Sequence, residues 1–183
     1  MNTVISTDFG PPRCKSQPSM DLRIHSLGDL LLTAVKSEVE SRDFYSEVSG
    51  AVRNALLKDR LEFLSREEEK HRIFFERLFK ERFPQKELVL PEKSPVPLPQ
   101  LRIESENTPI SEVLARGMDA ELAAHDFYTS LAARFDDKPE IKHALHYIAS
   151  MEMGHYRILE LERESAQRFE AVDFEWPMMH IGP

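Results

Sequence analysis

Apolar residues recur every three or four positions along four long stretches of the chain, and polar residues fill the positions between them. This spacing matches one face of an α-helix, so the pattern predicts four amphipathic helices. The four stretches cover roughly residues 27–48, 56–83, 111–135 and 139–166.

The expected helix boundaries carry their own signals. Ser26 is followed three residues later by Asp29, which resembles a capping box with aspartate in place of glutamate. A break is expected near residues 49–54. Pro84 should end the second helix, because proline cannot continue one, and Pro139 suits the first turn of the fourth.

Residues 84–109 are expected to form an extended connection. They contain Pro84, Pro91, Pro95, Pro97, Pro99 and Pro109. A helix of about 25 residues is about 38 Å long, and an extended segment of that length reaches further, at about 3.3 Å per residue. The second and third helices can therefore be parallel neighbours joined by a long crossover, which predicts an all-α four-helix bundle.

The chain should form a single domain with two appendages. We expect residues 1–25 to be a flexible arm and residues 26–168 to be the bundle, with 84–109 as its crossover. Residues 169–183 should be a C-terminal tail packed on the bundle or on a partner, with a short strand or a coil from Val172 onward.

Composition excludes several classes of function. The 183 residues carry a formal net charge of −8, which argues against a nucleic-acid partner. Cys14 is the single cysteine, so no internal disulfide can form. The longest apolar stretch, near Leu30–Val35, is far too short to cross a bilayer, and no secretory signal is recognisable. We therefore expect no membrane partner and a cytoplasmic protein.

An internal repeat brings in the candidate chemistry. The first helix carries Glu38 and, seven residues later, Tyr45; the third carries Glu121 and Tyr128 at the same spacing. Both stretches end in Asp-Phe-Tyr. The second and fourth helices each carry a Glu-x-x-His pair, Glu68 with His71 and Glu152 with His155. Two helix pairs of one design predict a pseudo-two-fold bundle.

Residues three apart lie on one face of a helix, so both members of each pair can reach the bundle centre. Four carboxylates and two imidazoles suit two iron ions, and also manganese. We expect Glu68 and Glu152 to bridge the ions, Glu38 and Glu121 to be terminal ligands, and one histidine, His71 or His155, to bind each ion.

Simpler interpretations exist for the single motifs. One Glu-x-x-His pair is usually a solvated surface pair, but four glutamates on core-facing stripes would be costly without a cation. Tyr45 and Tyr128 should point inward, where they either assist the site, by hydrogen-bonding the carboxylates or donating an electron, or simply fill the core. His125, one turn after Glu121, is either ordinary helix surface or a further site residue.

The neighbours of the glutamates support an inward-facing site. An apolar layer is expected beside the ions, from Leu61, Leu64, Leu145 and Ile148. Small residues on the inward stripes should leave space for metal, water or oxygen; they are Ala34, Ser41, Gly117 and Ala124.

Over about residues 27–166, these motifs resemble the rubrerythrin-type branch of the ferritin-like superfamily. The resemblance implies a ferritin-like bundle with a di-iron site that reduces hydrogen peroxide to water. Such proteins usually carry a rubredoxin-like domain with four cysteines that supplies electrons, and this sequence contains none. They also usually carry an extra carboxylate three residues after the third-helix glutamate, where this sequence has Ala124.

The leading functional hypothesis is therefore an oxidoreductase that reduces peroxide or dioxygen with electrons from a separate donor protein. The resemblance also implies a homodimer. Two alternatives stay open: a non-catalytic iron-binding, storage or sensing module, and a manganese protein with catalase-like chemistry.

Overall fold

The computed structural model describes residues 22–103, 105 and 108–175. Within them the chain forms four α-helices and two short 3-10 helices, and no strand. The elements are η1 (Leu22–Ile24), α1 (Leu27–Ala51), α2 (Ala55–Arg82), α3 (Ile110–Ala132), η2 (Ala133–Phe135) and α4 (Pro139–Glu175).

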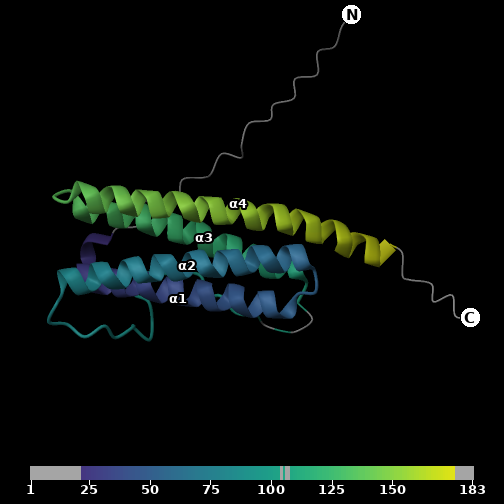
Figure 1. Ribbon diagram of the computed structural model, residues 1–183, viewed down its shortest axis with the longest axis horizontal. Helices are drawn as coiled ribbons and strands as arrows, with labels where there is room; N and C mark the ends of the chain where they lie inside the picture. Colours follow the sequence, from purple (N-terminus) through teal and green to yellow (C-terminus); the bar gives the residue numbers. More distant parts are fainter. Residues whose placement is uncertain (1–21, 104, 106–107, 176–183) are drawn as a thin grey trace, which may run out of the picture.

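The helices form two antiparallel hairpins laid side by side, α1 with α2 and α3 with α4 (Figure 1). Contacts within each hairpin far exceed those between α1 and α3 or between α2 and α4. Helices α2 and α3 run in the same direction, as the long connection between them requires (Figure 1). The predicted all-α, ferritin-like bundle is thus confirmed.

Side-chain caps start two of the helices, at Ser26 as the sequence indicated and also at Asn54. The Ser26 hydroxyl accepts a hydrogen bond from the Asp29 backbone N–H at 3.1 Å. The Asn54 side chain accepts from the backbone N–H groups of Leu56 and Leu57, at 3.0 and 3.1 Å. These oxygens satisfy donors that have no partner within the first helical turn.

Two apolar clusters fill the bundle, one toward each end. One contains Leu31, Phe75, Phe127 and Leu145, and the other Phe44, Leu61, Leu64, Leu114 and Leu159. On every helix, the residues of the Glu/His repeat lie between the positions that enter the two clusters. The bundle therefore places a polar layer across the middle of an otherwise apolar core.

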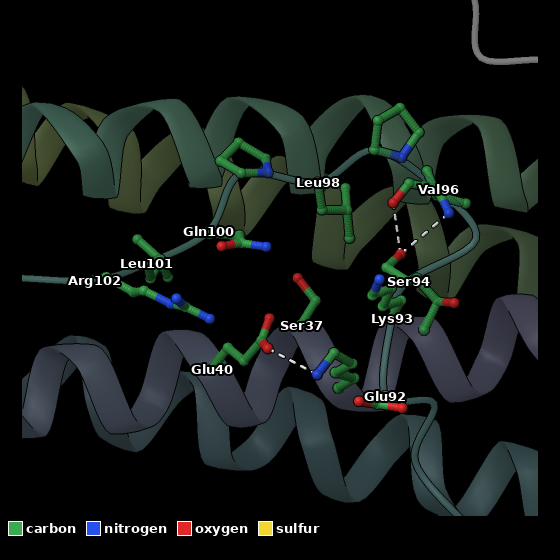
Figure 2. Close-up of a pocket in the computed structure, with 14 residues that line it drawn as sticks. Ser37, Glu40, Glu92, Lys93, Ser94, Val96, Leu98, Gln100, Leu101 and Arg102 are labelled. Carbon is green, nitrogen blue, oxygen red and sulfur yellow. Dashed lines mark hydrogen bonds and ion pairs between the residues drawn. The ribbon is translucent and has the colours of Figure 1, made fainter.

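The proline-rich crossover between α2 and α3 runs along the bundle, as expected. Val96 is 1% exposed, Leu98 packs on one apolar cluster, and Leu101 and Ile103 pack on the other. A cleft of about 390 Å³ separates the crossover from α1. Ser37, Glu40, Gln100 and Arg102 line it from the two sides (Figure 2).

Two expected boundaries are wrong. We expected the fourth helix to end near Ala166 and a tail to begin at residue 169, but α4 continues to Glu175, and its end extends past the other helices (Figure 1). The expected arm also ends earlier than residue 25, because Leu22 is buried and Arg134 donates hydrogen bonds to the Leu22 and His25 carbonyls.

The rest of the arm and of the tail, residues 1–21 and 176–183, lies outside the described residues. Across the described part, no helix is both long and apolar enough for a membrane span.

Candidate metal centre

All four helices contribute side chains to one buried polar cluster at the middle of the bundle. Glu38 comes from α1, Glu68 and His71 from α2, Glu121 from α3, and Glu152 and His155 from α4. None is more than 4% exposed. The structure thus brings together all six residues that the sequence singled out as metal ligands.

One half of the cluster is arranged around His71. Its Nδ1 atom lies 3.0 Å from Glu152 Oε1, 3.4 Å from Glu68 Oε2 and 3.7 Å from Glu38 Oε2. Three carboxylates from three helices therefore face a single imidazole nitrogen.

The other half repeats this arrangement around His155. Its Nδ1 atom lies 2.9 Å from Glu68 Oε1, 3.2 Å from Glu152 Oε2 and 3.7 Å from Glu121 Oε2. Glu68 and Glu152 thus each direct one oxygen toward each histidine. Glu38 and Glu121 each serve one half only.

These close contacts are not well-formed hydrogen bonds. Both Nδ1 atoms, Glu68 Oε1 and both carboxylate oxygens of Glu152 are buried without a hydrogen-bond partner. Nitrogen and oxygen atoms that converge in this way without hydrogen-bonding one another can be satisfied by a cation, which they would bind as ligands. Two overlapping groups have ligand atoms all within 4.8 Å of one another: Glu38, Glu68, His71 and Glu152, and Glu68, Glu121, Glu152 and His155.

The two tyrosines lie against the cluster, and each donates a hydrogen bond to the terminal glutamate on the other tyrosine's helix. The Tyr45 hydroxyl donates to Glu121, and the Tyr128 hydroxyl donates to Glu38. Each tyrosine therefore holds the glutamate of the other repeat rather than the glutamate of its own helix. Both rings are 0% exposed.

Burial and crowding perturb the protonation of this cluster. Burial raises the pKa of Glu38 and Glu121 well above the ordinary range, and the neighbouring carboxylate of Glu68 adds to the effect. Burial alone would lower the pKa of His155, but contacts with Glu121 and other carboxylates outweigh it and raise the pKa to about 12. Without metal, protons held by these groups offset negative charge in the cluster.

The surroundings also shift the pKa values of Glu68, His71 and the two tyrosines. Burial would raise the pKa of Glu68, but contacts with His155 and His71 outweigh it, and the pKa is lowered. The pKa of His71 is raised, because its carboxylate neighbours outweigh burial. Burial, reinforced by the charged cluster, raises the pKa of Tyr45 and Tyr128 well above the ordinary value, so both remain hydrogen-bond donors.

The structure also places the other residues that the sequence analysis named around the site. Leu61, Leu64, Leu145 and Ile148 are at most 5% exposed and form the expected apolar surroundings. Ala124 and Ser41 occupy matching buried positions, and the methyl group of Ala124 offers no ligand atom. His125 is half-buried, and its Nδ1 lies 2.8 Å from the Ala149 carbonyl of α4, so it links the two helices of its hairpin.

The fold and the site define a class: a four-helix bundle whose core holds a symmetric carboxylate–histidine cluster. Comparison with known proteins agrees. The rubrerythrin family model matches residues 29–162, so the chain belongs to the rubrerythrin family.

A hypothetical protein from Pyrococcus furiosus has a similar solved structure. It is 32% identical to this chain, with a TM-score of 0.72 over 83% of this chain and 97% of that one. No curated protein matches the chain. Family membership and the buried cluster together suggest a di-iron site.

Proposed function

We propose that the cluster holds two iron ions, and that the loaded protein reduces peroxide or dioxygen. Glu38 and His71 would bind one ion, and Glu121 and His155 the other. Glu68 and Glu152 would bridge them, since each directs one oxygen toward each histidine. The set of hard carboxylate oxygens with two imidazole nitrogens suits iron, and manganese as well.

Charge balance in a buried layer is the observation that carries this proposal. Four ionised carboxylates with two neutral imidazoles carry four negative charges, which two divalent ions neutralise. Uncompensated, that charge could not remain in a layer whose residues are at most 4% exposed. Protons can offset this charge in the metal-free protein, but several buried oxygen and nitrogen atoms then remain without a hydrogen bond, whereas metal ions would neutralise the charge and occupy those atoms together.

The reaction follows from what such a layer can do. When bound, the ions would supply Lewis acidity and the two electrons that, with two protons, convert hydrogen peroxide into two water molecules. The protein's own residues hold the geometry: Tyr45 and Tyr128 fix the terminal carboxylates, and the leucine-rich surroundings exclude bulk water. A separate donor protein would return the electrons, and we extend the proposal to a homodimer, as family likeness implies.

The decisive test uses protein loaded anaerobically with two ferrous ions per chain. One equivalent of hydrogen peroxide is added, and iron oxidation is followed by its optical absorption. We expect oxidation much faster than that of free ferrous ion under the same conditions. An equal rate would refute peroxide reduction at this site.

Metal analysis of the purified protein separates the other hypotheses. About two irons per chain support the proposed centre, whereas many irons per chain in a large assembly would indicate storage. Two manganese ions, with disproportionation of peroxide and no need for a donor, would indicate catalase-like chemistry instead.

A further inference from the structure

Gly117 lies in the interior of α3, one turn before Glu121. Glycine there destabilises a helix relative to alanine, so its presence calls for a local reason. A Cβ atom at this position would lie 3.1 Å from Leu159 Cδ1 and 3.3 Å from both Cε1 and the hydroxyl oxygen of Tyr45. The space that the sequence led us to assign to metal, water or oxygen is therefore filled by two side chains.

The tyrosine hydroxyl that rests on Gly117 is the one that donates to Glu121. Tyr45 is fully buried, and its ring meets Phe44 edge-on at a centroid distance of 5.5 Å. The hydroxyl thus lies against the backbone of α3 while it binds a carboxylate four residues further along the same helix. A methyl group at position 117 would require this hydroxyl to shift from its place against the helix.

We propose that Gly117 is a positioning residue: it lets Tyr45 approach α3 closely enough to fix the orientation of Glu121. This inference rests on the proposed metal centre, and it concerns the half of that centre built around Glu121 and His155. It makes the two halves of the repeat unequal.

In the half of the centre that contains Glu38, different residues surround the corresponding tyrosine, Tyr128. The repeat places Ala34 where α3 has Gly117, and Phe75 where α4 has Leu159. Ala34, Phe75 and Tyr128 belong to one buried cluster, and the rings of Phe75 and Tyr128 lie 4.8 Å apart. In that half, the ring of Phe75 packs beside the tyrosine at the place where the second half has the aliphatic side chain of Leu159. The first half accommodates the methyl group of Ala34, whereas in the second half a methyl group at position 117 would require Leu159 and Tyr45 to shift.

The first test needs no metal. In metal-free protein, the hydroxyl proton of Tyr45 should give a downfield NMR signal because it is buried and bound to a carboxylate; Tyr45→Phe assigns it by its loss. We expect Gly117→Ala to remove or strongly shift this signal and the matched variant Ala34→Gly to preserve it. An unchanged signal in folded Gly117→Ala would overturn the inference.

The second test is titration of the metal-free protein with Co²⁺. Gly117→Ala should lower the binding affinity for one of the two ions by about 10- to 100-fold, the loss expected when a metal ligand loses its hydrogen-bond partner. Tyr45→Phe should lower the affinity for the same ion. The double variant should lose no more affinity than either single variant, because both substitutions act through one hydrogen bond. Wild-type affinity combined with a lower melting temperature would show a packing role only and overturn the inference, as would additive losses.

Two controls keep the outcomes separate. If Gly117→Ala does not fold, Gly117→Ala/Leu159→Ala replaces it, because that pair removes the closer of the two collisions and retains the one with Tyr45. If wild-type protein binds no Co²⁺, Mn²⁺ or Fe²⁺, the proposed function fails, and the NMR comparison still decides whether Gly117 positions the tyrosine.

Discussion

Replacing Glu68 by alanine should remove most of the stabilisation that metal gives to the fold. Glu68 directs one carboxylate oxygen toward His71 and the other toward His155, at 3.4 and 2.9 Å. Its loss therefore takes one ligand from each of the two proposed ions. Glu121 faces only one half, so Glu121→Ala should affect a single ion.

The expected magnitudes follow from linkage. Free metal at a hundred times its dissociation constant stabilises the folded state by about 2.7 kcal/mol per ion, or about 5 kcal/mol for two independent ions. For a domain of this size, each kcal/mol raises the melting temperature by about 2–4 °C, which predicts a rise of about 10–20 °C in the wild type. If Glu68→Ala lowers the affinity for both ions a hundredfold, about 0.8 kcal/mol of the stabilisation by metal remains. Glu121→Ala should keep about half of the wild-type rise in melting temperature.

The assay is thermal unfolding of each variant, with a chelator and with excess Mn²⁺ under reducing conditions. Only the shift between the two states is compared, since each substitution also changes the metal-free stability. Glu164→Ala is the matched control, because that side chain is 57% exposed on α4, the helix that also carries Glu152 and His155. A shift in Glu68→Ala as large as in the wild type would refute the bridging arrangement.

Three further predictions concern the protein's own groups. The metal-free protein should lose stability as pH rises from about 6.5 toward 12, because the folded-state pKa of His155 is raised to about 12 and the unfolded value is about 6.5; urea unfolding at pH 6 and pH 9 checks the sign, and equal stability would contradict it. Tyr128→Phe should cost the metal-free fold about 1–3 kcal/mol, since it leaves a buried carboxyl oxygen of Glu38 without its hydrogen-bond donor; urea unfolding measures this. Asn54→Ala should cost about 1 kcal/mol by removing the cap of α2, and calorimetric titration should show unchanged metal uptake.

Helical periodicity and the repeat could predict most of the fold and the composition of the cluster. The periodicity depends on local sequence, and the Glu-x-x-His spacing determines which face of α2 and α4 carries both groups. A chain with two copies of one hairpin has few ways to bury four such faces together. The positions of Glu38, Glu68, Glu121 and Glu152 at the bundle centre follow from that constraint.

The partners of the tyrosines could not be predicted in the same way. Tyr45 lies seven residues after Glu38, about 10 Å along the helix axis, which places that carboxylate out of its reach. Its actual partner, Glu121, is 76 residues away. Which helix passes close enough depends on the tertiary arrangement.

The end of α4 was mispredicted for a related reason. Residues 167–175 contain no proline or glycine to stop the helix. The Glu170 carboxylate also accepts hydrogen bonds from the Ser111 backbone N–H and hydroxyl, at 3.1 and 2.6 Å. This contact links the last turns of α4 to the start of α3, and no local pattern reveals it.

The division of the bundle into two hairpins joined by a crossover has a consequence for assembly. Each hairpin supplies half of the donor set, so a single hairpin could complete the cluster only by meeting a second one. The crossover holds both halves in one molecule and fixes their effective concentration independently of how much protein is present. Uptake of metal should therefore follow the free metal concentration alone, and dilution of the protein should not release it.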